Sequence, residues 1–421
     1  MVKKLRGNLN VLNVNAILQI FVSKIIIIVL GFASNVLIVR TIGLEGVGSV
    51  SVFLAFMGLI SALSHLGLPV SNIYYLSRVK DKTILLSNSL LFIFLIAFIS
   101  TILVYIFEPF IQKTYLENLS PFFIYVIFIG LLLSLTKVFY STFLRALERF
   151  KEFSKASILE QLSRVGLIFV VYTFFDLTAD IIIILTYVSI IIANSYRIYI
   201  IKNDIRFTLK SYDLNQFIIS IKYGLKDFTG SAANTLTTQI DLIVLAFIVT
   251  KEDIGLIVIA TALAKIIQYG SDSIGSVILS QIANSKDKKK SLKIMAVSVV
   301  LNTGVGLLFL LLLYFSGRYL IEVIYKIPSE VAFELTLLYA LGLILFGNVL
   351  IAAKFISGLG YPWQKSLVRI YSLPFKLISL YVLATEYGIL GAAYSYLATT
   401  LVMLLISIYF IKKILASKDE Y

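Results

Sequence analysis

The chain has 421 residues, of which 59% are hydrophobic and 14% are charged, and its formal net charge is +14. So apolar a composition excludes an ordinary soluble domain, and the absence of cysteine excludes disulfides and thiolate chemistry. The excess of Lys and Arg is more typical of a membrane protein with basic cytoplasmic loops or a cationic cavity than of a nucleic-acid-binding protein.

Apolar segments recur along the whole chain and predict an all-α integral membrane protein with about twelve transmembrane helices. A helix needs about 20 apolar residues to cross about 30 Å of hydrocarbon. We expect the first helix to be uncleaved, and we expect a break or kink near Pro69. The predicted helices are residues 14–39, 47–76, 83–107, 121–144, 156–175, 181–201, 216–249, 253–283, 293–315, 331–355, 365–384 and 388–411.

Loop charge predicts that both termini lie in the cytoplasm. Cytoplasmic loops of membrane proteins are enriched in Lys and Arg. The loops expected inside carry most of the basic residues, in segments 3–6, 78–82, 145–155, 202–210 and 286–290, at Lys365 and in segment 412–418. The loops expected outside hold Arg40, Lys113, Lys251, Arg318 and Lys326. If one helix had been missed or added, basic loops would no longer alternate with less basic loops along the chain.

The predicted helices fall into two halves of six. We expect an N-terminal lobe over residues 1–202, a cytoplasmic linker over 203–215 and a C-terminal lobe over 216–421. The segment "VRTIGLEGVGSVSVFLA" (39–55) resembles "VTKEDIGLIVIATALA" (249–264), and the two hold matching places in the halves. Six helices per half imply a parallel repeat, an arrangement found in two-lobed transporters.

Ionisable and polar residues form stripes along several apolar helices. Lys24 lies about 15 Å into the first helix, on the same face as Asn35. The seventh helix carries Lys226, Asn234 and Asp241 on one stripe. The other stripe residues are Lys265, Gln268 and Asp272 in the eighth helix, and Arg369 and Lys376 in the eleventh. Such charges usually face protein or a water-filled cavity, because hydrocarbon disfavours them.

The deep cations outnumber the deep acids, which predicts a cationic cavity between the two halves. We expect it to bind phosphate or pyrophosphate through Lys24, Lys226, Lys265, Lys376 and Arg369. Asn35, Asn234, Asp241, Gln268 and Asp272 are expected to be polar cavity residues, with the two acids as candidates for H⁺ or Na⁺ coupling. The competing interpretation is neutralisation within the protein, which we favour for Glu160 and Arg164 at i and i+4.

Four motifs, in order, resemble those of the polysaccharide flippases (O-antigen, Wzx-like) of the multidrug/oligosaccharidyl-lipid/polysaccharide exporter superfamily. They are "VRTIGLEGVGSVS", with Arg40, Gly43, Glu45 and Gly48; "FLRALERFKEFS"; "QIDLIVLAF", with Asp241; and "EYGILGAAYSYLATT". The family commonly has Arg after the aspartate, and Leu242 stands there instead.

The resemblance implies a V-shaped, MATE-like fold of two lobes that open alternately to each side of a bacterial cytoplasmic (inner) membrane. It implies a flippase rather than an enzyme, with no cofactor. The expected partners are a polyprenyl-pyrophosphate-linked glycan, the lipid bilayer, H⁺ or Na⁺ as a coupling ion, and other membrane proteins of polysaccharide assembly. No nucleic-acid partner is expected.

Two other functions are compatible with a chain of many helices. A multidrug/cation antiporter of the same superfamily should prefer an acidic cavity, whereas this cavity is predicted to be basic. A membrane glycosyltransferase or polymerase should present acid/base groups or a substantial outer loop. The loops here are short and the acids are scattered.

Overall fold

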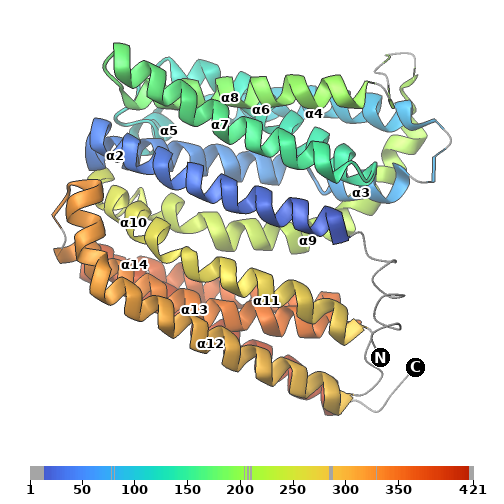
Figure 1. Ribbon diagram of the computed structural model, residues 1–421. Helices are drawn as coiled ribbons and strands as arrows, with labels where there is room; N and C mark the ends of the chain where they lie inside the picture. The colour runs from blue at the N-terminus through green and yellow to red at the C-terminus, as the bar shows by residue number, and fades with distance from the viewer. Residues whose placement is uncertain are drawn as a thin grey trace. The chain divides into compact units, whose positions relative to one another are not determined.

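The structure of the protein is a computed structural model (Figure 1). It describes residues 14–416 except residues 77, 80, 203, 206–207, 209–210, 284–287 and 329. The described residues form helices and turns and contain no strand. This confirms the predicted all-α fold class.

The helices follow the predicted order with two differences: an additional helix lies over 108–115, and the helix predicted over 253–283 is divided into two at residue 265. They are α2 (Val14–Ser64), α3 (Leu68–Leu76), α4 (Lys82–Ile106), α5 (Glu108–Tyr115), α6 (Phe123–Ala146), α7 (Phe150–Phe174), α8 (Ala179–Ile201), α9 (Leu214–Leu245), α10 (Lys251–Ala264), α11 (Ile266–Ala283), α12 (Lys288–Tyr319), a π-helical turn η2 (Leu320–Tyr325), α13 (Glu330–Gly358) and α14 (Pro362–Ala416).

Two of these helices contain a glycine with non-helical backbone angles. Gly43 interrupts α2 at φ 68°, and Gly388 interrupts α14 at φ 57°. Glycine adopts positive φ without the steric cost that a Cβ would bring. The expected break near Pro69 is present, because the chain turns at Gly67 (φ 71°) and α3 begins with Pro69 as its second residue.

Nine helices of the described residues are long and apolar enough to cross a membrane. Two of them, 25–64 and 363–416, are 40 and 54 residues long, and each contains one of the non-helical glycines. The chain is therefore a multi-pass membrane protein. The count of twelve spans and the inside orientation of the termini stay predictions.

Contacts divide the chain into two compact units. Unit 1 comprises residues 1–42 and 56–231, and unit 2 comprises residues 43–55 and 232–421. The organisation into two six-helix lobes, 1–202 and 216–421, joined by a linker at 203–215, stays a prediction.

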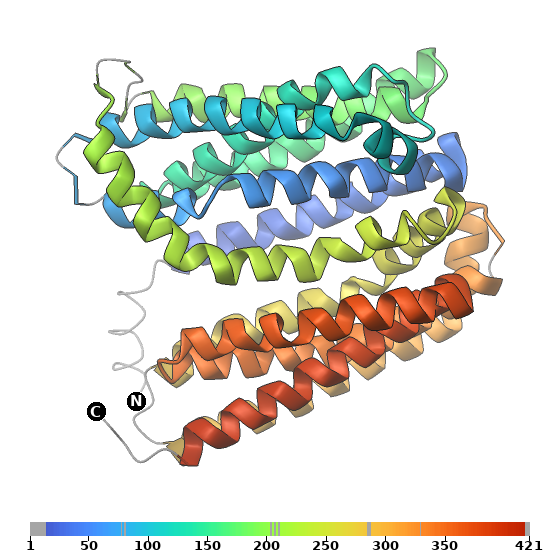
Figure 2. The same ribbon diagram turned by 180° about the vertical axis from the view of Figure 1, so that it is seen from behind.

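In unit 1, α6 packs against α3, α4 and α8, and α7 packs against α8 (Figures 1 and 2). One apolar cluster joins the ends of these helices. It contains Leu76, Leu85, Leu86, Tyr140, Phe143, Leu144, Ile201 and Ile205. In unit 2, α13 packs against α10, α11, α12 and α14, and its buried face includes Phe355 and Ile356.

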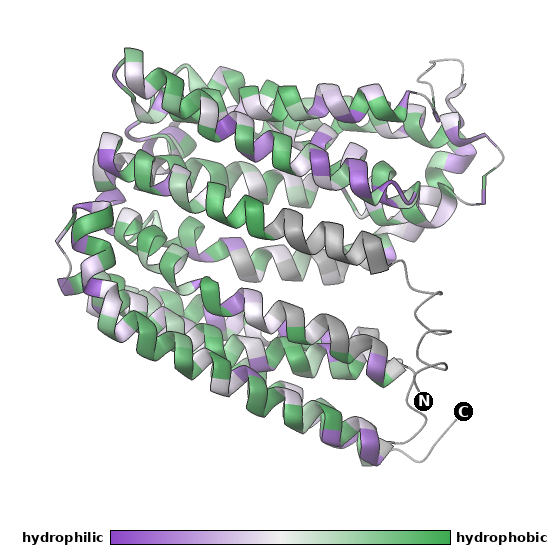
Figure 3. Cartoon of the chain, in the orientation of Figure 1, coloured by the Kyte–Doolittle hydropathy of each residue, from purple (hydrophilic) through white to green (hydrophobic). Residues whose placement is uncertain are grey.

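The α4 helix has the polarity of a membrane helix, with small polar residues inside and large apolar residues outside. Ser87, Asn88 and Ser89 are buried, whereas Phe94 and Phe98 are exposed. The buried Asn72 of α3 donates to Ser89 at 2.7 Å. Small and hydrogen-bonding residues favour close packing between helices in lipid. Residues coloured as hydrophobic recur along the described helices (Figure 3).

Candidate functional site

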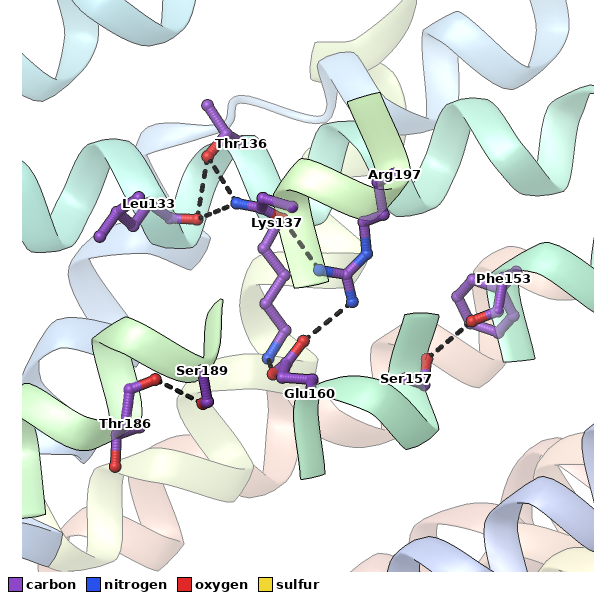
Figure 4. Close-up of polar contacts among 10 residues, drawn as sticks. Leu133, Thr136, Lys137, Phe153, Ser157, Glu160, Thr186, Ser189 and Arg197 are labelled. Carbon is purple, nitrogen blue, oxygen red and sulfur yellow. Dashed lines mark hydrogen bonds and ion pairs between the residues drawn. The ribbon is translucent and has the colours of Figure 1, made fainter. Parts of the chain in front are cut away.

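Four ionisable residues on three neighbouring helices of unit 1 form what we name the unit 1 charge cluster: Lys137 of α6, Glu160 and Arg164 of α7, and Arg197 of α8. Two cations share the Glu160 carboxylate (Figure 4). Nζ of Lys137 lies 2.5 Å from Oε1, and Nη2 of Arg197 donates to Oε2 at 2.8 Å. Each carboxylate oxygen therefore has its own cationic donor.

Arg197 is held on its other side by an amide. Its Nη1 donates to Oδ1 of Asn194 at 2.8 Å. Nδ2 of Asn194 in turn donates to Oγ1 of Thr136 at 3.1 Å and to the carbonyl of Leu133 at 3.3 Å. The Arg197 side chain is 1% exposed. A planar guanidinium with fixed partners on two edges is a rigid support for Glu160.

The cluster lies well inside the helices that carry it. Lys137 precedes the end of α6 at Ala146 by nine residues, or about 13 Å, and Glu160 follows the start of α7 at Phe150 by ten residues, or about 15 Å. The Lys137 side chain is nevertheless 40% exposed, against 17% for Glu160. The cluster is therefore buried where Arg197 lies and accessible where Lys137 lies.

A second buried ion pair lies in unit 2. Nζ of Lys376 on α14 lies 2.8 Å from Oδ1 and 2.9 Å from Oδ2 of Asp241 on α9, and it also donates to the backbone carbonyl of Thr237. Lys376 is 3% exposed. Tyr339 and Tyr396 lie within electrostatic reach of Asp241. The pair therefore neutralises both charges inside the unit.

Unit 2 also contains a buried network of neutral polar side chains. Oγ of Ser271 donates to Oδ1 of Asn302, and Nδ2 of Asn302 donates to Oδ1 of Asn348 at 2.9 Å. Asn348 donates onward to Thr303. A Cβ at Gly347 would stand 2.3 Å from the Ser271 hydroxyl oxygen, so a larger residue there would have to displace the side chains of this network. The network links α11, α12 and α13 by hydrogen bonds.

Among the predicted site residues whose side chains the structure describes, one pair is in contact, Lys376 and Asp241. Lys226 on α9 and Lys265 at the junction of α10 and α11 are exposed, and Arg369 and Gln268 are half-buried. The amide oxygen of Asn35 is buried without a hydrogen-bond partner among the described residues. Lys376 is thus a partnered cation, whereas its role in binding pyrophosphate stays a prediction.

Three predicted side chains lie outside the part of the chain whose side chains the structure describes: Lys24, Asn234 and Asp272. Their predicted places on the cavity stripes are therefore predictions only.

Sequence reasoning missed the principal partners of Glu160. It paired Glu160 with Arg164, four residues along the same helix, but the bonds of Glu160 go to Lys137 and Arg197 on neighbouring helices. One signal was present in the sequence. Asn194 and Arg197 stand three residues apart in the largely apolar α8, and a spacing of three places them on one helical face.

No group of three or more His, Cys, Asp or Glu side chains that could hold a metal occurs within the described ranges of the chain. The charged groups that the structure brings together there are cations paired with carboxylates, and at Glu160 two cations share one carboxylate. Such groups can bind and orient an anion, or they can hold helices together.

Three solved structures of membrane transporters resemble the fold. The protein resembles "Lipid II flippase MurJ, inward closed conformation", with a TM-score of 0.77 and 15% identity over 93% of this chain and 87% of that one. It resembles an inward-facing multidrug resistance MATE family transporter of the MOP superfamily, with a TM-score of 0.71 and 14% identity over 93% and 96%. It also resembles a MOP superfamily transporter from Pyrococcus furiosus, with a TM-score of 0.64 and 15% identity over 95% of both chains.

These likenesses, with the apolar helices, place the protein among multi-pass membrane proteins of the MurJ and MATE fold. Residues 14–279 match the family described as polysaccharide biosynthesis protein. The chain belongs to this family, which confirms the resemblance drawn from the sequence motifs. No curated protein matches the chain.

Proposed function

We propose that this protein is a flippase, which moves a polyprenyl-pyrophosphate-linked oligosaccharide from the cytoplasmic to the outer face of a bacterial cytoplasmic membrane. The observation that carries the proposal is the presence of cations without carboxylate partners in a protein of the polysaccharide biosynthesis family. Lys226, Lys265 and Arg369 have no ion-pair partner among the described residues. A cation inside a membrane protein marks a substrate or ion pathway by default.

In the proposed mechanism, the pyrophosphate is the anion that these cations bind. Lysine binds phosphate oxygens as a point charge, and arginine can form two parallel hydrogen bonds to them. Lys24, Lys226, Lys265, Arg369 and Lys376 are the residues proposed for this contact. The sugars would occupy the aqueous cavity while the polyprenyl chain stays in lipid. Alternating access between two lobes would then deliver the head group outward.

The direction of transport can come from the membrane potential or from a coupled ion. Moving a negative charge outward across an inside-negative membrane is favourable by about 2.3 kcal/mol per charge per 100 mV. Asp241 and Asp272 are the proposed sites for H⁺ or Na⁺. In the structure Asp241 is already neutralised by Lys376, so an ion that binds there has to compete with an internal ammonium group.

A strain that lacks the gene tests the proposal. We expect lipid-linked oligosaccharide to accumulate on the cytoplasmic leaflet, and we expect the wild-type gene to relieve it. The combined variant Lys226→Gln with Lys265→Gln should relieve it at least about tenfold more slowly, because each lost charge-assisted contact removes about 1.5–3 kcal/mol of binding. Lys155→Gln is the matched control, since Lys155 is an exposed lysine at the start of α7.

Other outcomes identify the competing functions. A drug exporter, which the MATE likeness favours, would leave the glycolipid of the deletion strain unchanged. A polymerase defect would leave single repeat units on the outer face. Full transport by the double lysine variant, with normal insertion in the membrane, would contradict the cationic site.

A further inference from the structure

The unit 1 charge cluster contains more positive charge than its carboxylate can balance. Lys137, Arg164 and Arg197 are cations, and Glu160 is the only acid bonded to any of them among the described residues. Purely structural ion pairs inside a membrane protein should balance, because each uncompensated charge costs solvation free energy. An excess of two positive charges therefore needs another explanation.

Arg164 carries one of the surplus charges. It lies one turn beyond Glu160 on α7, and its Nε is buried without a hydrogen-bond partner among the described residues. A buried donor that is left unbonded costs about 1–3 kcal/mol, and more when the group is charged. Such a cost is tolerated where a ligand supplies the missing acceptor.

The adjoining face of α2 is also polar. The amide of Gln161 on α7 lies beside Gly31, where a Cβ would stand 3.6 Å from its Nε2. Asn35 lies one turn beyond Gly31, and its buried Oδ1 has no partner among the described residues. A small residue of α2 therefore lies against a polar side chain of α7 that directly follows Glu160 in the sequence.

Lys137 carries the other surplus charge and marks the open side of the cluster. Its side chain is 40% exposed although it lies about 13 Å inside α6. A lysine side chain that is exposed at that depth is disfavoured against hydrocarbon, so we expect it to face water or a bound anion.

We propose that the unit 1 charge cluster is an oxyanion-binding site, in which Lys137 and Arg164 bind the anion and the Arg197–Glu160 pair positions them. The ligand is a phosphate-type or carboxylate anion, which in the substrate is either the carrier pyrophosphate or an acidic sugar of the glycan. This proposal rests on the proposed flippase function. It adds a site formed by α6, α7 and α8 to the cations predicted on other helices.

Glu160 acts in this site as an internal competitor for the ligand. When an oxyanion arrives, Lys137 can exchange its bond to Glu160 for one to the ligand, while Arg197 keeps Glu160 in place through the second carboxylate oxygen. Removal of the Glu160 charge should therefore strengthen anion binding. A purely structural cluster predicts instead a loss of stability and no change in anion binding.

The test measures binding of two probes, inorganic pyrophosphate and glucuronate, to the purified full-length protein by calorimetry. We expect saturable binding to the wild type and at least about tenfold weaker binding to Arg164→Gln and to Lys137→Gln, since each loses a charged contact of about 1.5–3 kcal/mol. Glu160→Gln should bind more tightly than the wild type. Lys155→Gln, on the same helix as Arg164, should bind like the wild type. Tighter binding of pyrophosphate identifies the carrier as the source of the anion, and tighter binding of glucuronate identifies the glycan.

Three results would overturn the site: no binding of either probe by the wild type, unchanged binding by both Arg164→Gln and Lys137→Gln, or weaker binding by a folded Glu160→Gln. If Arg164→Gln does not fold, Arg164→Lys takes its place. It keeps the charge but loses the planar fork, so it should bind at an intermediate affinity. Wild-type affinity in this variant would also overturn the site.

Wild-type transport in cells by a protein that binds neither probe would remove this site and leave the flippase proposal intact. A deletion strain without accumulated glycolipid would remove the flippase proposal, whatever the probes show.

Discussion

Lys376 illustrates how a single residue can hold a positive charge inside an apolar helix. Its ammonium group contacts both carboxylate oxygens of Asp241 and the carbonyl of Thr237. The cost of taking two charges out of water is offset only when the geometry is good and further hydrogen bonds are made. The third contact, to Thr237, meets that condition.

Replacing one partner of this pair should destabilise the protein more than replacing both partners. Lys376→Met or Asp241→Asn leaves one charge buried and unpaired, which costs about 3–5 kcal/mol in such cases. The double variant should recover much of that loss. Thermal unfolding of the purified variants measures the effect, and a double variant as unstable as the sum of the two single variants would contradict the pairing.

At the scale of elements, the part of α2 that follows its break at Gly43 crosses the start of α10 at two glycines within unit 2. A Cβ at Gly48 of α2 would stand 1.7 Å from the carbonyl oxygen of Lys251, and a Cβ at Gly255 of α10 would stand 2.2 Å from that of Leu44. Leu44 lies four residues before Gly48, and Lys251 lies four residues before Gly255. Each helix therefore offers both a glycine and a carbonyl to the other, and the contact is reciprocal. The two segments are the ones whose similarity indicated an internal repeat. The similarity is thus accompanied by a shared packing role.

Alanine at either glycine should disrupt this crossing. Both obstructing atoms are backbone oxygens, which cannot rotate away as a side chain would. Overpacking typically costs about 1–3 kcal/mol, and we expect Gly48→Ala and Gly255→Ala to lower the melting temperature. Gly166→Ala and Gly304→Ala are the controls, because nothing lies within 4 Å of a Cβ at those positions. Equal melting temperatures for all four variants would contradict the close contact.

The α5 helix was not among the predicted elements. Sequence reasoning placed Glu108–Tyr115 in a loop, because it lies between two apolar runs and contains Pro109. Proline is nevertheless compatible with the first turn of a helix, where its missing N–H would be unbonded anyway. Buried Ile111 and Tyr115 show the apolar face that makes the short helix stable.

At the scale of the whole molecule, the predicted topology rests on loop charge alone. Since the chain has no cysteine, single cysteines report accessibility without background. We expect Lys113→Cys and Arg318→Cys to react with a membrane-impermeant maleimide in intact cells. Lys151→Cys and Lys412→Cys should react only after the membrane is opened. Labelling of Lys412→Cys in intact cells would contradict a cytoplasmic C-terminus.

The sequence by itself determined that this is an all-helical membrane protein of a polysaccharide biosynthesis family. Hydropathy is a local property, because every run of about 20 apolar residues has to satisfy its own backbone hydrogen bonds in lipid. The order of helices and the breaks at glycine and proline follow from the same local chemistry. The motifs that indicated the family are also contiguous stretches of chain.

Only the tertiary structure decided which charges are partnered. Lys376 and Asp241 are 135 residues apart, and Arg197 and Glu160 are 37 apart. Sequence spacing reveals partners on one helical face, which is why it suggested Arg164 for Glu160. Ion pairs between helices depend on how helices pack and rotate, and helix packing joins residues that are remote in the chain. The same packing leaves Lys137 and Arg164 as the surplus cations of the unit 1 charge cluster, where a substrate oxyanion is proposed to bind.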